Sequence, residues 1–286
     1  MLNSFSGYLV VDKPPNVSSH DVVLSVRKIV GKRVKVGHTG TLDPLATGVL
    51  ILAVGKATRL SEYLLKQDKC YIVKGRFGLS SDTYDLDGKI EEVPCPGITK
   101  DALLKVLERF RGEIEQIPPP FSAIRIKGKR AYELARKGEK VELKPRRVKI
   151  YSLKLLDFTY PDFELEVCCS SGTYIRTLVH DIGKAPGCDA VVVELRRTKV
   201  ANVTIDKAVP LSELSKDNIR SFLIPADELL DMPEIKLSPE SKKRFKNGAK
   251  IRVEAPDGLY KVYSDGEFLG VGVVRSNLLK PEKVLS

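Results

Sequence analysis

The chain has 286 residues, of which 42% are hydrophobic, so it is long enough for two domains and can bury a sizeable core. It contains no run of 18 or more apolar residues and no signal-peptide layout at its start, so we expect no membrane segment and a cytoplasmic location. The net charge of +11 favours a polyanionic partner.

The five cysteines, at positions 70, 95, 168, 169 and 188, show no CxxC spacing. Cys168 and Cys169 are adjacent, so on a strand they would point to opposite faces. This pattern predicts neither a zinc site nor a disulfide framework, and it favours a protein with reduced thiols.

The first 31 residues predict a strand, a turn and a helix. Residues 7–11, GYLVV, are typical of a strand, and Ser18 and Ser19 are typical helix caps. Apolar residues then recur with helical spacing as far as Val30, after which Gly31 can end the helix. In the turn before the helix we expect Asn16 to adopt a positive φ, which asparagine tolerates better than other residues with a side chain.

The stretch 36–60, VGHTGTLDPLATGVLILAVGKATRL, places one carboxylate in a constrained turn ahead of a buried strand. Asp43 lies between Leu42 and Pro44, and the apolar run 49–54 follows. Proline restricts the backbone beside this acid, and the nearby glycines allow tight turns that other residues avoid. Because aspartate is common in turns, an Asp-Pro turn on its own names no reaction.

The middle of the chain mixes strands and helices without an internal repeat. We expect strands at 69–79, 149–158, 163–169 and 191–195, a helix capped by Thr99, and a helix that follows the sequence SSGTY at 170–174. Three consecutive prolines at 118–120 exclude a helix there. The segment 121–150 holds 11 Lys and Arg against 3 Asp and Glu, which predicts a surface for a polyanion.

The last part of the chain predicts a small β-rich unit. From about residue 231 we expect a helix near 238–247 and short strands at 251–255, 259–264 and 268–274. Ser264, Asp265 and Gly266 form the predicted hairpin turn between two of these strands. Such a layout is compatible with many folds.

The stretch 36–60, together with KPPNVSSHDVV at 13–23, resembles the TruB family of tRNA pseudouridine synthases. The resemblance implies an α/β (α+β) pseudouridine synthase fold, with a mixed, mainly antiparallel sheet cut by a central catalytic cleft. It implies a catalytic domain at 1–228 with a thumb-like basic insertion at about 118–148. It also implies a PUA-like RNA-binding domain at 229–286.

The resemblance further implies a reaction, the isomerisation of uridine 55 in the T loop of tRNA to pseudouridine. The base is extruded from the RNA, detached from the sugar and rejoined through C5. No redox change occurs, so neither a cofactor nor a metal is expected, and GxGxxG and P-loop motifs are absent from the sequence. We expect a monomer that binds the T arm of tRNA without an obligatory protein partner.

Three residues match the catalytic positions of the family. Asp43 matches the nucleophilic aspartate, which must stay ionised and therefore calls for a nearby cation. Arg176 matches the arginine that pairs with it, and Tyr71 matches the tyrosine that stacks on the target base. Further positions implied at the base are His38, which fills the space that the base leaves, and Tyr174 and Leu195, which line the uracil pocket.

The basic segment is implied to contact the RNA backbone, through Lys127, Lys129, Arg130 and Arg136. Such contacts position an RNA without reading its sequence.

Two other functions stay open from the sequence alone. A guide-RNA-dependent synthase of the archaeal and eukaryotic type shares the catalytic motif, although the long segment 121–150 and the lack of extended basic tails favour a stand-alone enzyme. A non-catalytic tRNA-binding protein or folding chaperone is the second alternative. The presence of Asp43, Tyr71 and Arg176 argues against a pure binder.

Overall fold

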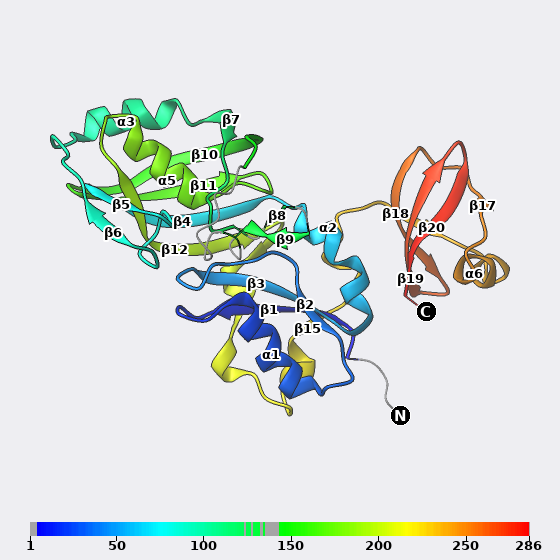
Figure 1. Cartoon of the computed structure of the whole chain (residues 1–286). Helices are drawn as coiled ribbons and strands as arrows, with labels where there is room; N and C mark the ends of the chain where they lie inside the picture. The colour runs from blue at the N-terminus through cyan, green and yellow to red at the C-terminus, as the bar shows by residue number, and fades with distance from the viewer. Residues whose placement is uncertain (1–4, 123, 127, 132–133, 135–142, 286) are drawn as a thin grey trace.

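The computed structural model describes residues 5–122, 124–126, 128–131, 134 and 143–285, and Figure 1 shows the whole chain. Within these residues, one mixed sheet of 11 strands carries most of the chain, and a separate sheet of five strands follows at the C-terminal end. Strand pairing in the large sheet is mainly antiparallel, with parallel pairs between β1 and β14 and between β3 and β12. The predicted α+β fold with a mixed, mainly antiparallel sheet is confirmed.

The large sheet has the spatial order β14-β1-β3-β12-β4-β11-β10-β7, with β15 beside β1, β2 beside β3 and β13 beside β12. Its strands are β1 (Gly7–Lys13), β2 (Val36–His38), β3 (Thr47–Val54), β4 (Lys69–Phe77), β7 (Gly112–Gln116), β10 (Arg146–Thr159), β11 (Asp162–Cys169), β12 (Ala190–Val200), β13 (Val203–Thr204), β14 (Val209–Pro210) and β15 (Leu223–Ile224).

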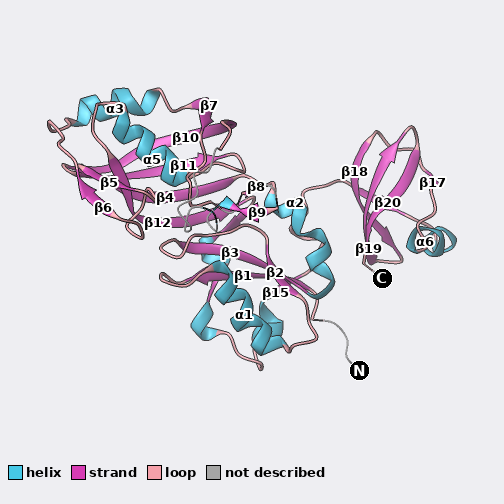
Figure 2. Cartoon of the chain, viewed as in Figure 1, coloured by secondary structure: helices cyan, strands magenta, loops and turns pink. Residues whose placement is uncertain are grey.

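Helices are short and cover parts of the sheet, as Figure 2 shows. The α-helices of the described residues are α1 (Ser19–Val30), α2 (Ser61–Leu65), α3 (Lys100–Glu108), α5 (Ile175–Lys184) and α6 (Pro239–Lys246). The 3₁₀ turns are η1 (Gly55–Leu60), η2 (Ile205–Lys207), η3 (Leu211–Glu213) and η4 (Ile219–Phe222). Two small antiparallel sheets have two strands each. One pairs β5 (Leu79–Ser81) with β6 (Ile90–Glu92), and the other pairs β8 (Arg125–Ile126) with β9 (Lys129–Arg130).

Local signals in the sequence set the ends of several helices. Ser18 caps α1 and forms a capping box with Asp21, and Gly31 ends this helix with φ 99°. Thr99 caps α3 as predicted. Asn16 has φ 62°, which confirms the expected left-handed turn. Ser19 is not a cap, because it lies inside α1 and its hydroxyl group bonds elsewhere.

Two parts of the large sheet meet at a narrow junction. β3 pairs with β12 in parallel at two positions, Thr47 with Arg196 and Gly48 with Arg197. At Gly48, which has φ 98°, an added Cβ would lie 2.2 Å from the Arg197 carbonyl oxygen, so only glycine allows this approach. Beyond these two positions the strand groups separate, and in Figure 1 they form an upper group with β4 and β12 and a lower group with β1 and β3.

The hydrophobic core fills the space between helices and sheet in both groups. α1 contributes Val22, Val23 and Val26 to a cluster that continues through α5 and α3. A second cluster lies on the other face of β1 and β3, where Tyr8 and Ile51 pack with Leu230. The outer face of the β4–β11–β10 part carries solvent-exposed ion pairs instead, as expected for an antiparallel sheet with one wet face.

Disulfide bonds join two pairs of cysteines, which corrects the expectation of reduced thiols without a disulfide framework. Cys70 on β4 is bonded to Cys168 on β11, and the strand register places these residues directly opposite each other. Cys95 is bonded to Cys188, while Cys169 is a buried free thiol. The bonded partners are separated by 98 and 93 residues, so only the tertiary pairing brings them together.

The C-terminal sheet has its own core, and Val271 of its strand β19 also belongs to the second cluster around Tyr8 and Ile51. Its order is β16-β18-β19-β20-β17, and Phe245 of α6 packs into its core with Val262 and Leu269. Asp265 and Gly266 both have positive φ, which confirms the predicted hairpin turn. Its strands are β16 (Glu234–Lys236), β17 (Ile251–Arg252), β18 (Gly258–Ser264), β19 (Glu267–Arg275) and β20 (Leu278–Val284).

No helix among the described residues combines the length and apolar character that a membrane crossing requires.

Asp181 on α5 provides a test of how burial affects stability. Burial raises the pKa of this carboxyl from 3.8 to about 6. The folded protein therefore binds the proton more tightly than the unfolded chain, and stability is lost as the pH rises from about 4 to about 6. Asp181→Asn should therefore be more stable than the wild type at pH 8 and similar to it at pH 4.

Urea unfolding at pH 4 and pH 8 measures this difference. Asp157→Asn, a change at an exposed carboxylate on β10, is the control and should alter neither value appreciably. Equal stabilities of wild type and Asp181→Asn at both pH values would contradict the prediction.

Candidate active site

Asp43 lies on the loop between β2 and β3, and the preceding motif holds the backbone of this loop. Ser19 of α1 exchanges two hydrogen bonds with Leu42, donating to its carbonyl oxygen and accepting from its N–H, both at 2.8 Å. The Pro44 carbonyl oxygen accepts from the Lys13 ammonium at 3.1 Å and from the Asn16 N–H at 2.9 Å. The two sequence motifs at 13–23 and 36–60 therefore form one structural unit around Asp43.

Lys13 is fully buried although it is a lysine. Its ammonium donates to the carbonyl oxygens of Pro14, Val17 and Pro44, which replace the water lost on burial. Burial lowers the pKa of Lys13 to about 8, and the carboxylate of Asp43 acts in the opposite direction.

Arg176 contacts Asp43 directly, as the sequence predicted. Its Nε lies 2.9 Å from Oδ2 of Asp43, and the arginine side chain is only 6% exposed while that of Asp43 is 36% exposed. Arg176 sits in the first turn of α5, whose start is held by Gln116 of β7. The Gln116 amide donates to the Tyr174 carbonyl oxygen at 3.2 Å and accepts from the Tyr174 N–H at 3.0 Å. An open carboxylate and a buried cation thus form a fixed pair.

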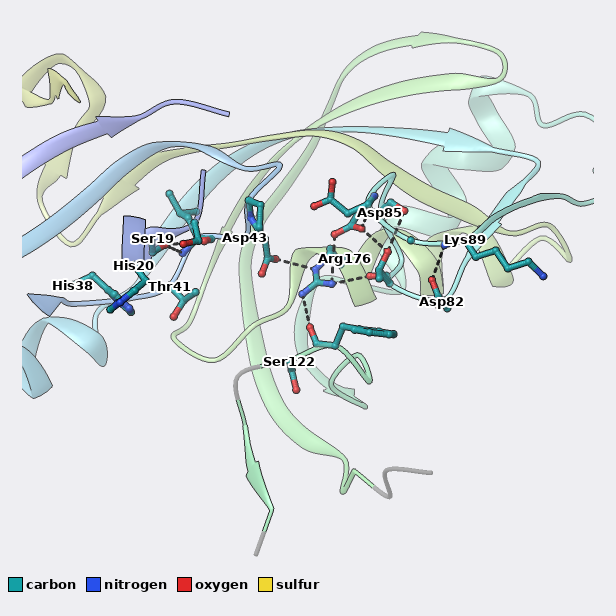
Figure 3. A pocket seen from close by; sticks show the side chains of 17 residues that line it. Ser19, His20, His38, Thr41, Asp43, Asp82, Asp85, Lys89, Ser122 and Arg176 are labelled. Carbon is teal, nitrogen blue, oxygen red and sulfur yellow. Dashed lines mark hydrogen bonds and ion pairs between the residues drawn. The ribbon is translucent and has the colours of Figure 1, made fainter. Parts of the chain in front are cut away.

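The guanidinium group of Arg176 serves more than one acceptor. It donates from Nη1 to the Thr83 carbonyl oxygen at 2.8 Å and from Nη2 to the Phe121 carbonyl oxygen at 3.0 Å. Nη1 also lies 3.4 Å from Oδ2 of Asp85. Figure 3 shows Asp43 and Asp85 on opposite sides of the arginine. The arginine is therefore held from several sides and presents one edge to Asp43.

Asp85 is a buried carboxylate that the sequence analysis did not identify. Its side chain is 3% exposed, and its Oδ1 accepts from Thr83 Oγ1 at 2.5 Å and from the Asp87 N–H at 3.1 Å. Burial raises the pKa of Asp85, while Thr83 and Arg176 oppose the rise. The sequence signal available was weak, because SSDTYDLDG reads as an ordinary polar turn.

Asp43 and Arg176 lie where two cavities meet. One cavity, of about 580 Å³, is lined by His38, Asp85 and Phe121. The other, of about 390 Å³, is lined by residues of β4, β12 and the loop before α5. Both cavities include Asp43 and Arg176 in their walls, so the carboxylate can be reached from either side.

The smaller cavity contains the residues that were predicted to surround the base. Tyr71 on β4 is 7% exposed and lines it together with Tyr174 and Leu195. Burial raises the pKa of both tyrosines, so each keeps its proton at neutral pH. Leu195 also belongs to the main hydrophobic cluster, so it has a packing role as well as a lining role. His38 lies apart from this group, on the wall of the larger cavity.

The structure describes two of the four residues that were predicted to contact the RNA backbone. Lys127 and Arg136 lie outside the described residues. Lys129 and Arg130 form β9, which pairs with β8 in an antiparallel hairpin. Their contact with RNA stays a prediction.

Comparison with known families accounts for nearly the whole chain. The model described as "TruB family pseudouridylate synthase (N terminal domain)" matches residues 27–175. The "tRNA pseudouridylate synthase B C-terminal domain" matches residues 176–231, and "Pseudouridine synthase II TruB, C-terminal" matches residues 233–285. The fold described above is therefore that of a pseudouridylate synthase.

Individual relatives are similar over their full lengths. The tRNA pseudouridine synthase B of Aquifex aeolicus is 44% identical over 285 residues, which cover 98% of this chain and 99% of that protein. The protein of the same name from Caldanaerobacter subterraneus subsp. tengcongensis is 42% identical over 98% of this chain and 99% of its own. The chain belongs to the TruB family of pseudouridylate synthases.

Solved structures share the fold at lower identity. A chain from the crystal structure of a Cbf5-Nop10-Gar1 complex superposes with a TM-score of 0.73 at 25% identity, covering 98% of this chain and 85% of that one. A chain from the archaeal box H/ACA sRNP Nop10-Cbf5 complex gives a TM-score of 0.72 at 25% identity, with 98% and 86% coverage.

Proposed function

We propose that the chain converts uridine 55 in the T loop of tRNA to pseudouridine and does so without a protein or RNA partner. The observation that carries this proposal is the Asp43–Arg176 pair, which lies between two cavities of a pseudouridylate synthase fold. The near-complete coverage of relatives named tRNA pseudouridine synthase B supports tRNA as the substrate.

In the proposed reaction Asp43 is the nucleophile: its carboxylate forms a transient bond to the base or to C1′ of ribose, and this bond breaks again before pseudouridine is released. The bond between N1 of uracil and C1′ of ribose breaks, the base turns, and a bond forms between C5 and C1′. The C5 proton is released and N1 gains a proton, so the atoms balance and no electrons are gained or lost. Arg176 pairs with Asp43 and fixes the position of its carboxylate.

The other predicted site residues are assigned roles in binding the base and the RNA. Tyr71 stacks on the flipped uracil, and Tyr174 and Leu195 close the smaller cavity around it. His38, on the wall of the larger cavity, occupies the space that the base leaves in the RNA loop. Lys127, Lys129, Arg130 and Arg136 are proposed to bind phosphates, so that the RNA loop is recognised by its shape.

The chain is proposed to consist of two domains with different roles. Residues 1–228 form the catalytic domain, with a basic insertion at about 118–148, and residues 229–286 form a PUA-like unit that binds RNA. The separate core of the C-terminal sheet supports this division. The enzyme is proposed to act as a cytoplasmic monomer without a cofactor.

Incubation of the purified protein with an unmodified tRNA transcript tests the function. Pseudouridine mapped at nucleotide resolution should appear at position 55 without any addition. No product from the protein alone, but product after a guide RNA and partner proteins are added, would favour the guide-RNA-dependent alternative. Tight tRNA binding without product under either condition would favour the chaperone alternative.

Asp85 is expected to contribute to the rate through Arg176. Asp85→Asn removes the charge that faces Arg176 Nη1 and leaves the shape of the site intact. The loss should be about 10- to 100-fold in the rate, in line with the ~1.5–3 kcal/mol of a hydrogen bond to a charged group.

A single-turnover assay with saturating enzyme measures this rate, and tRNA affinity should change little. Asp87→Asn, a change at an exposed carboxylate two residues further along, is the matched control. If both variants kept the wild-type rate, Asp85 would have no catalytic influence.

A further inference from the structure

Arg197 is a buried cation at the junction between the two strand groups. It is 2% exposed and ranks among the largest fully buried side chains of the described residues. Its backbone lies against Gly48, one of the two positions at which β12 pairs with β3. Burial of a guanidinium group costs several kcal/mol unless its donors are satisfied, so the contacts of this residue are informative.

The side chain of Arg197 reaches the loop that carries Asp43. Nε donates to the Val49 carbonyl oxygen at 2.7 Å, Nη2 to that of Gly40 at 3.1 Å and Nη1 to that of Thr41 at 3.3 Å. Gly40 and Thr41 come three and two residues before Asp43, respectively. Among the described residues, no carboxylate forms an ion pair with Arg197. The guanidinium group therefore binds backbone carbonyl oxygens, two of which lie close to the proposed nucleophile Asp43 in the chain.

Arg197 also lies beside Tyr71 of the other strand group. The register of β12 with β4 places Arg197 directly opposite Tyr71, so the two side chains share one face of the sheet. Arg197, Tyr71 and Asp43 all line the smaller cavity.

We infer that Arg197 is a positioning residue that ties the Asp43 loop to Tyr71 and so sets the separation of these two groups across the smaller cavity. This inference rests on the proposed roles of Asp43 and Tyr71. The planar guanidinium group suits the task because it offers five donors in a fixed geometry, whereas the ammonium of lysine offers three around one point. The neighbouring lysine in this region, Lys69, is buried and donates to Leu65 and Gln67 instead.

The test compares Arg197→Met and Arg197→Lys with wild type in kcat, KM and thermal stability. If Arg197 sets the separation, kcat for Arg197→Met should fall by about a hundredfold, the typical cost of a displacement near 1 Å, while KM changes little. Arg197→Lys should recover part of the rate, because it keeps the charge and some of the donors. Since removal of a buried side chain can prevent folding, Arg197→Lys decides the question if Arg197→Met does not fold.

Arg196→Met is the matched control, since it removes the same charge from the adjacent position of β12. Arg196 points to the other face and pairs with both carboxylate oxygens of Asp12, at 3.1 and 2.7 Å. This variant should keep the wild-type kcat even if it loses some stability.

A double-mutant cycle with Tyr71→Phe separates positioning from general support of the fold. The Arg197→Lys change should cost less in the Tyr71→Phe background, because that background already lacks the hydroxyl group whose separation from Asp43 Arg197 is inferred to set. A wild-type kcat for folded Arg197→Lys, or a loss equal to that of Arg196→Met, would overturn the inference. Failure of the wild type to form pseudouridine in tRNA would instead contradict the proposed function, so the two failures are distinguishable.

Discussion

Asp43→Asn is expected to abolish turnover and to leave the protein folded. Asparagine keeps the size of the side chain but cannot act as the nucleophile, so the rate should fall by roughly 10⁴-fold or more. The fold should tolerate the change because Asp43 is partly exposed, and because Arg176 keeps Asp85 and two carbonyl oxygens as acceptors. The backbone of the loop is held by Ser19, Lys13 and Arg197 independently of the carboxylate.

Single-turnover assays with excess enzyme measure this loss, and direct binding assays show whether tRNA affinity persists. Asp162→Asn is the control, since Asp162 forms an exposed pair with Arg76 on the solvated face of the sheet. That variant should behave like the wild type, because exposed pairs contribute little. Appreciable product from Asp43→Asn within one turnover would refute the assignment of Asp43 as the nucleophile.

Local features of the fold could be read from the sequence because their causes are local. Ser18 and Thr99 begin helices through bonds to backbone groups only three residues away. Asn16 and Asp265 adopt positive φ in turns that their own side chains tolerate. The apolar run 49–54 predicted β3 correctly, because every residue from Gly48 to Val54 is buried.

Features that depend on strand register could not be read in this way. Asp85 meets Arg176 from 91 positions away in the chain, and Arg197 meets Gly40 from 157 positions away. The disulfides were missed for the same reason, since Cys70 and Cys168 become neighbours only when β4 pairs with β11. β20 was missed because its sequence, LLKPEKV, contains a proline and three charged residues, which is unusual for a strand.

The candidate site was predicted by resemblance more than by pattern. Spacing alone would have left Asp43 as a turn aspartate and Arg176 as a helix arginine. The structure adds how these two residues are held. The Nε atom of Arg176 pairs with Asp43, while its Nη atoms contact Thr83, Phe121 and Asp85. This arrangement differs from a two-donor fork on one carboxylate and changes what a substitution should do.

Arg176→Lys is therefore expected to be far from conservative. A lysine ammonium has three donors around one atom and cannot reach acceptors that lie on three sides of the guanidinium plane. We expect the single-turnover rate to fall by at least about a hundredfold, because Asp43 loses its fixed aim. Affinity for tRNA should change little, since the Arg176 side chain is only 6% exposed.

Arg176→Ala should be worse in both rate and stability. It leaves Asp85 buried without its cation, and the loss of one partner from a buried pair typically costs about 3–5 kcal/mol. Because Arg176 opposes the burial that raises the pKa of Asp85, its removal should raise this pKa further. An acid with a raised folded pKa loses stability as the pH rises from its ordinary value of 3.8 toward the folded value, so the deficit of Arg176→Ala should be larger at pH 8 than at pH 4.

Unfolding curves at pH 4 and pH 8, together with single-turnover rates for wild type, Arg176→Lys and Arg176→Ala, measure these effects. Arg76→Ala serves as the control, because Arg76 also pairs with an aspartate but on the solvated face. The lysine variant should lie between wild type and the alanine variant in stability, since it keeps a positive charge near Asp85, yet it should lose most of the rate. If Arg176→Ala retained the wild-type rate, Asp43 would be held in place by its own loop, and Arg176 would be only a structural partner of Asp85.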